Sequence, residues 1–268
     1  MYMMHGEDFC FLRIQKRRSV RNWRSMRNIR LDLCYDGTRY RGWQRLSNTD
    51  NTIQQKLETA LSRILNEPIE VSGSGRTDAG THAKMQVVSF HTRSEMSCEE
   101  ILTQLRRYLP EDIGIYTCKN TSPRFHARLN AKTKTYCYRV WNSEAPCVFQ
   151  RKYVYTDPSD LDLDEMRAAA EHMLGQHDFS AFCAKATKKS TVRYIESLTI
   201  ERQEQEIRFT VTGNGFLHHM VRIMVSTLLE VGRGERKADS IPELFGARRE
   251  MAGPLIPACG LCLMEVTY

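Results

Sequence analysis

The chain has 268 residues, of which 41% are hydrophobic and 26% are charged, which is ordinary for a globular protein. Its formal net charge is +7, but eight Lys or Arg residues and only two acids fall within the first 30 positions, so the rest is nearly neutral. These values exclude disorder as the default and confine any attraction to nucleic acid to the N-terminal segment and to local basic faces.

No membrane-spanning or targeting segment is expected. The most hydrophobic stretch, residues 216–231, is interrupted by two histidines, Arg222 and Glu230, so it is too short and too polar to span a bilayer. Near the N-terminus, Glu7 and Asp8 precede a scattered basic run rather than the apolar run of a signal sequence. Nine dispersed cysteines fit reduced thiols, and we therefore expect a cytoplasmic protein.

Residues 1–28 form a basic extension, which either adds attraction to RNA phosphates or is a disordered arm or start-codon artefact without that role. After it, Thr52 with Gln55 and Ser97 with Glu100 form capping boxes that open two helices. The first half, residues 29–123, is predicted to contain strands at 29–35, 69–73, 86–92 and 112–118 and helices at 53–65 and 98–109.

The second half, residues 124–268, repeats this mixture of elements. Residues 134–141 alternate, with Tyr136, Tyr138 and Val140 on one side of a strand. The pattern predicts two α+β halves that share one sheet. The predicted elements of the second half are strands at 134–141, 191–202, 206–213 and 260–268 and helices at 162–174 and 217–231.

A glycine-rich segment, residues 71–90, raises the question of what its charged residues do. Asp78 stands where a dinucleotide fingerprint needs its third glycine, and no lysine follows Gly80 as a phosphate-binding P-loop requires. The segment is therefore predicted to be a loop between strands, whose glycines let another backbone or a ligand approach Asp78 closely. The alternative is a tight turn in which Arg76 and Asp78 form a surface ion pair.

The predicted helix at 217–231 is apolar on nearly all sides, so Arg222 within it is expected to be buried. An arginine stays charged, and a buried one requires a carboxylate partner. Asp78 is a candidate, although Glu230 and Asp178 are equally possible from the spacing alone. Such a pair can be purely structural.

Seven segments stand out in a fixed order: YDGTRYRGWQ (35–44), GSGRTDAGTHA (73–83), PRFHAR (123–128), KTYCYRV (134–140), HDFSAF (177–182), GFLHHMVR (215–222) and GLCLMEVTY (260–268). Together they resemble the TruA family of tRNA pseudouridine synthases over residues 28–268. The resemblance implies an α+β fold in which two similar, α/β-sandwich-like halves share a largely antiparallel mixed sheet, with a positively lined catalytic cleft between them.

The resemblance also implies roles for single residues. Asp78 matches the catalytic aspartate, whose carboxylate attacks the nucleotide so that the N1–C1′ bond breaks, the uracil turns and C5 joins C1′. Tyr136 matches the tyrosine that packs on the uracil and is proposed to help remove the C5 proton; without the resemblance it would be an ordinary core tyrosine. Arg222 matches the partner of the aspartate, and Arg76 the arginine that fills the space left by the extruded base.

Further residues are expected to bind the RNA substrate, although surface or structural roles remain the alternative. Aromatic, cationic and amide groups suit contacts with unpaired nucleotides. A zinc site at Cys259 and Cys262 is not expected, because no second cysteine pair accompanies them. The expected substrate-binding residues are Tyr40, Trp43, Gln44, His126, Arg128 and His219.

From this resemblance we expect a homodimeric enzyme that isomerises uridines around positions 38 to 40 in the tRNA anticodon stem-loop. The reaction changes no redox state and releases no group, so neither a metal nor an organic cofactor is expected. Two alternatives remain at this stage: the same chemistry on ribosomal RNA, and an RNA-binding paralogue without catalysis.

Overall fold

The computed structural model describes residues 26–185 and 188–268, so most of the predicted basic extension lies outside the described residues. The helices and strands follow one another in the order β1 (Arg27–Tyr35), α1 (Ile53–Leu65), β2 (Ser72–Gly73), β3 (His82–Thr92), α2 (Cys98–Tyr108), β4 (Ile113–Thr121), β5 (Lys134–Trp141), β6 (Tyr155–Thr156), α3 (Leu163–Glu171), β7 (Gly175–Asp178), β8 (Val192–Gln203), β9 (Glu206–Gly213), α4 (Met220–Gly232) and β10 (Leu261–Val266).

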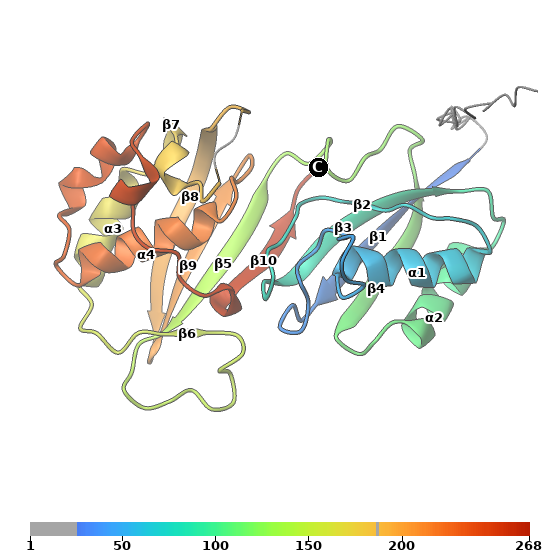
Figure 1. Ribbon diagram of the computed structural model, residues 1–268, viewed down its shortest axis with the longest axis horizontal. Helices are drawn as coiled ribbons and strands as arrows, with labels where there is room; N and C mark the ends of the chain where they lie inside the picture. The colour runs from blue at the N-terminus through green and yellow to red at the C-terminus, as the bar shows by residue number, and fades with distance from the viewer. Residues whose placement is uncertain (1–25, 186–187) are drawn as a thin grey trace, which may run out of the picture.

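The described strands form one ten-stranded sheet in the order β4-β1-β3-β10-β5-β9-β8-β7, with β2 beside β3 and β6 beside β5. Only the β10–β3 and β5–β6 pairs are parallel among them. Helices α1 and α2 lie over the strands of the first half, and α3 and α4 over those of the second (Figure 1). The predicted α+β class with a shared, largely antiparallel mixed sheet is therefore confirmed.

The last strand of the chain joins the two halves. β10 lies between β3 and β5, and its Cys262 is opposite His82 on one side and Cys137 on the other. This partner explains why β3 begins at His82 rather than at the predicted residue 86. The predicted division at residues 123 and 124 falls in the segment between β4 and β5, and it stays a prediction.

Other differences from the predicted elements also have local causes. Thr52 caps α1 by accepting a hydrogen bond from the Gln55 backbone, but the Gln55 side chain donates to Thr59, so only half of that capping box is formed. The full box predicted at Ser97 is present at α2. α3 ends at Glu171 rather than at the predicted residue 174, and Gly175, with φ of 86°, then starts β7, a strand that the sequence pattern did not predict.

The apolar helix α4 is buried along almost its whole length, as its sequence predicts, and packs against α3 and β5. It spans 13 residues. Across the described ranges, no helix combines the length and the apolar character that crossing a membrane requires.

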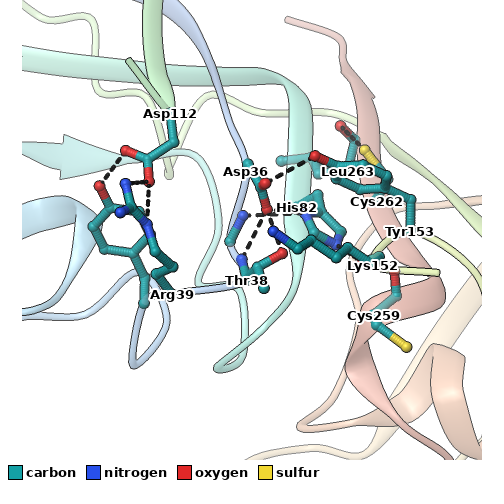
Figure 2. A network of polar contacts seen from close by, with 12 residues as sticks. Asp36, Thr38, Arg39, His82, Asp112, Lys152, Tyr153, Cys259, Cys262 and Leu263 are labelled. Carbon is teal, nitrogen blue, oxygen red and sulfur yellow. Dashed lines mark hydrogen bonds and ion pairs between the residues drawn. The ribbon is translucent and has the colours of Figure 1, made fainter. Parts of the chain in front are cut away.

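A polar network centred on His82 ties the halves together beside the sheet (Figure 2). The Nε2 atom of His82 lies 3.1 Å from the carbonyl oxygen of Lys152 and 3.2 Å from that of Cys259. The hydroxyl of Tyr153 donates to Asp36 over 2.9 Å. The loop after β1, the start of β3, the segment before β6 and the turn before β10 therefore meet at one histidine.

This network predicts a loss of stability in mild acid. His82 Nδ1 accepts a hydrogen bond from the Gly37 backbone, and burial lowers the pKa of His82 despite the opposing Asp36 carboxylate. Below about pH 6.5 the unfolded chain then binds a proton more readily than the folded chain, so the free energy of unfolding should fall as the pH drops. Urea unfolding between about pH 5 and 7.5 should show a weaker pH dependence for His82→Gln than for the wild type, whereas exposed His172→Gln should retain the wild-type slope.

Candidate active site

The loop that carries Asp78 connects β2 to β3 and is held by buried hydrogen bonds at several points. The backbone nitrogen of Trp43 donates to the Thr77 carbonyl over 3.0 Å, and the Gln86 side chain donates to the Gly75 carbonyl over 3.0 Å. These bonds fix the backbone on the N-terminal side of Asp78. The position of its carboxylate is therefore set by the sheet and by the loop after β1.

Two glycines allow this close packing of loop on loop. A Cβ atom on Gly37 would lie 1.9 Å from the Thr81 carbonyl oxygen, and one on Gly73 would lie 2.5 Å from the Trp43 ring. Neither position can accept a side chain without moving the neighbouring group. Because Gly37 lies outside the glycine-rich segment and the neighbour of Gly73 is a side chain, the approach of another backbone or a ligand to Asp78 past the glycines of residues 71–90 stays a prediction.

The carboxylate of Asp78 faces three cationic or ionisable groups. Its Oδ2 atom lies 3.5 Å from Nη1 of Arg222 and 3.4 Å from Nε2 of His219, and its Oδ1 atom lies 3.9 Å from Nε2 of His218. The predicted pairing of Asp78 with Arg222 is confirmed, while Glu230 pairs with another arginine. The Asp78 side chain is 23% exposed, so it remains accessible to a ligand.

Arg222 approaches the carboxylate from inside the protein. It lies in the first turn of α4, is only 8% exposed, and donates from Nε to the Ile256 carbonyl over 2.7 Å. Because this bond fixes the plane of the guanidinium, Nη1 stays directed at Asp78. The guanidinium therefore fixes the direction from which the Asp78 carboxylate is paired.

His219 supports the same carboxylate. It precedes α4 in a left-handed conformation with φ of 63°, and its Nδ1 atom is buried without a hydrogen-bond partner among the described residues. The ring proton is thus better placed on Nε2, which faces Asp78. Burial lowers the pKa of His219 despite the Asp78 carboxylate, so the ring is neutral near pH 7. Although ligand atoms of Asp78, His218 and His219 lie within 4.8 Å of one another, the adjacent Arg222 opposes a bound cation.

Tyr136 projects from β5 toward the same place. Its ring packs edge-on against Phe216, with centroids 5.1 Å apart, and is 7% exposed. Burial raises the pKa of Tyr136, with further contributions from Tyr35 and Asp78, so the phenol stays protonated at neutral pH. The residue is therefore both a core tyrosine and part of the site.

Two cavities meet at this point. The first, called the inner cavity, has a volume of about 270 Å³ and is lined by Asp78 and Tyr136. The second, called the outer cavity, has a volume of about 510 Å³ and is lined by Gln44 and His126. They share Arg76 and Arg128. Further predicted residues divide between them, with His219 in the inner wall and Gln44, Trp43 and His126 in the outer wall.

Two of the predicted substrate-binding residues are almost completely buried. Tyr40 is 5% exposed, lines neither cavity, and donates its hydroxyl to Asp112 over 2.6 Å. Trp43 is 2% exposed and packs against Gly73 and Tyr35. Contact of these two rings with RNA stays a prediction, and the packing supports a structural role for both.

That role predicts a stability defect for Trp43→Ala. Removing a fully buried indole from beneath the Asp78 loop should lower the free energy of unfolding by about 3–5 kcal/mol. Urea denaturation measures this loss. Leu46→Ala, at a side chain that is 43% exposed, should change the same quantity by less than about 1 kcal/mol.

The sequence interpretation missed Lys134, Phe216 and Leu217, which all line the inner cavity. A signal for Lys134 was available. It precedes Tyr136 by two positions on an alternating strand, so both side chains project from the same face. Phe216 and Leu217 had no such signal, since apolar residues before an apolar helix are typical of a core.

The chain shares sequence with proteins of one family. The family described as tRNA pseudouridine synthase matches residues 34–130 and 169–268. The tRNA pseudouridine synthase A 2 of Bacillus cereus (strain ZK / E33L) is 43% identical over 245 residues, which are 91% of this chain and 100% of that protein. The tRNA pseudouridine synthase A 1 of Clostridium tetani (strain Massachusetts / E88) is 45% identical over the same shares of both chains.

Among solved structures, the crystal structure of the archaeal box H/ACA sRNP Nop10-Cbf5 complex aligns with a TM-score of 0.35 and 12% identity. The alignment covers 75% of this chain and 44% of that one. A likeness of this degree carries no inference about function.

Proposed function

Because the chain belongs to the tRNA pseudouridine synthase family, we propose that it isomerises uridine to pseudouridine in tRNA, with Asp78 as the nucleophile. The target region is the anticodon stem-loop, around positions 38 to 40. The enzyme is an isomerase that acts in the cytoplasm as a homodimer. The proposed reaction needs neither a metal nor an organic cofactor, because it changes no redox state overall and loses no group to water.

The observation that carries this proposal is the carboxylate of Asp78 in the wall of a small cavity, paired with the buried guanidinium of Arg222. In the proposed reaction, this carboxylate attacks the nucleotide and the N1–C1′ bond breaks. The freed uracil turns within the cavity, C5 bonds to C1′, the bond between Asp78 and the nucleotide breaks, C5 loses its proton and N1 gains one. Nucleophilic catalysis requires an oriented carboxylate, and Arg222 with the Nε2–H of His219 supplies that orientation.

Tyr136 holds the uracil in this proposal. A base must leave the helical stack before the carboxylate can reach its sugar, and an aromatic surface then stabilises it. Because the phenol of Tyr136 is protonated, it is a weak base in the resting enzyme. If it accepts the C5 proton, it must pass its own hydroxyl proton onward in the same step.

The outer cavity receives the RNA around the extruded nucleotide. Arg76 and Arg128 are exposed in the walls of both cavities, and Gln44 and His126 add hydrogen-bonding groups to the outer one. Cationic and amide side chains of this kind contact phosphates and unpaired bases. Arg76, two residues before Asp78, fills the space that the extruded base leaves.

A direct test incubates the purified protein with an unmodified tRNA transcript and maps pseudouridine by nucleotide-resolved chemical labelling. Conversion should occur in the anticodon stem-loop and depend on the protein. A ribosomal RNA transcript, treated identically, should remain unmodified. Conversion confined to the ribosomal RNA, or no conversion of either RNA while both bind, would contradict the proposal.

A further inference from the structure

Lys134 contributes an unpaired cation to the inner cavity. It lies at the start of β5 and is half-buried, and its ammonium group makes no hydrogen bond or ion pair within residues 26–185 and 188–268. A Cβ atom on Gly75 would be 3.6 Å from its Nζ atom and 3.7 Å from the hydroxyl of Tyr136. The ammonium group therefore lies against the Asp78 loop, beside the tyrosine.

The surroundings of Lys134 concentrate positive charge without neutralising it. Arg76 and Arg128 line the same cavity, and neither side chain has an ion pair or hydrogen bond among the described residues. Asp78 is the sole acid that the described part of the chain contributes to this lining, and it faces Arg222 and the two histidines. Burial, together with Arg128 and Arg193, lowers the pKa of Lys134 to about 8.

An arrangement of this kind is unfavourable for the free protein and favourable for an anion complex. A cation that is withdrawn from water without a partner loses hydration, and its neighbours repel it. Both effects are relieved when an anion binds. An anion that enters the site with the proposed substrate is the phosphodiester backbone, which carries one negative charge per nucleotide.

We propose that Lys134, together with Arg128, forms a subsite for an RNA backbone phosphate at or next to the reacting uridine. The inference rests on the proposed function and extends it to a residue that positions the substrate. Lys134 and Tyr136 are two residues apart on one strand face, roughly 6.6 Å along the strand. This separation lets one nucleotide place its base by Tyr136 and a phosphate by Lys134.

The test pairs a protein variant with a neutralised phosphate. Anticodon stem-loop RNAs carry a single methylphosphonate, which removes the charge of one phosphate, at each position flanking the target uridine. For the wild type, one such position should weaken binding and lower kcat/KM by roughly ten- to a hundredfold. With unmodified RNA, Lys134→Ala should show the same decrease in affinity and in kcat/KM. The methylphosphonate that affects the wild type should then cause no further decrease in this variant. Lys134→Arg should retain most of the wild-type affinity.

Lys84→Ala is the matched control, because Lys84 is an exposed lysine of β3 that lines a different cavity. It should behave as the wild type with every RNA. The proposal is overturned if Lys134→Ala remains as sensitive as the wild type to every methylphosphonate. It is also overturned if Lys134→Ala lowers only kcat, equally for all RNAs, since this would indicate proton transfer by the lysine.

The two proposals can fail separately. If the wild type binds the stem-loop but forms no pseudouridine, the proposed function fails, and the affinity measurements still decide the phosphate subsite. If the wild type converts uridine, but every methylphosphonate weakens RNA binding by Lys134→Ala as much as it weakens binding by the wild type, only the phosphate subsite fails.

Discussion

Asp78→Asn is expected to abolish pseudouridine formation, lowering the single-turnover rate by roughly 10⁴-fold or more, while tRNA affinity changes by less than about threefold. Asparagine has nearly the same size as aspartate but is neutral and a poor nucleophile. The contacts of Asp78 with Arg222 and His219 lie inside the protein, whereas the exposed arginines of the two cavities can still bind RNA. Pseudouridine formation in the tRNA under single-turnover conditions and fluorescence anisotropy measure the two quantities.

Asp157→Asn provides a control for loss of a buried aspartate–arginine pair. Asp157 is 5% exposed and pairs with Arg233 over 2.9 Å, and it lines neither the inner nor the outer cavity. This variant should lose stability but retain the wild-type conversion rate. An Asp78→Asn enzyme that still converts uridine within tenfold of the wild-type rate would rule out nucleophilic catalysis by this carboxylate.

Arg222→Met is expected to have the second largest effect, slowing conversion by roughly 10²- to 10³-fold. Methionine fills a similar volume, but it removes both the cation near Asp78 and the donor to the Ile256 carbonyl. The carboxylate then keeps only the histidines as partners and loses its fixed orientation. The buried carbonyl loses its donor as well, so the free energy of unfolding should fall by about 1–3 kcal/mol.

The stability effect can be separated from the catalytic effect with Arg236→Met. Like Arg222, Arg236 pairs with a carboxylate, that of Glu230, and donates to a backbone carbonyl, that of Met251, but it lies outside both cavities. This variant should be destabilised without a change in the conversion rate per folded enzyme. Equal losses of rate in Arg222→Met and Arg236→Met, measured below the unfolding temperature of both, would mean that Arg222 has only a structural role.

The parts of the fold that depend on local sequence could be predicted. Thr52 and Ser97 cap α1 and α2 as expected, because a cap needs only residues a few positions apart. The place of β10 between β3 and β5 could not be predicted, since strand order depends on partners far away in the chain. The extension of β3 to His82 could not be predicted either, because its partner β10 is also far away in the chain.

In the candidate site, too, features set by local sequence could be predicted, and features set by distant parts of the chain could not. A buried arginine requires a carboxylate partner, so the sequence predicted that Arg222 pairs with Asp78 or with another acid. Only the fold shows that the partner is Asp78. The composition of residues 40–44 suggested RNA contact, but composition cannot reveal that the Tyr40 and Trp43 rings lie in the core. The placement of the His219 ring proton on Nε2 depends on Nδ1 having no hydrogen-bond partner among the described residues, which no local pattern encodes.

The central claim is that the buried guanidinium of Arg222 holds and orients the carboxylate of Asp78. A double-mutant cycle of Asp78→Asn and Arg222→Met, followed by urea unfolding, measures the coupling between these side chains directly. The pairing predicts a coupling free energy of about 1–3 kcal/mol, with the double variant less destabilised than the sum of the single variants. Additive losses, within about 0.5 kcal/mol, would contradict the claim.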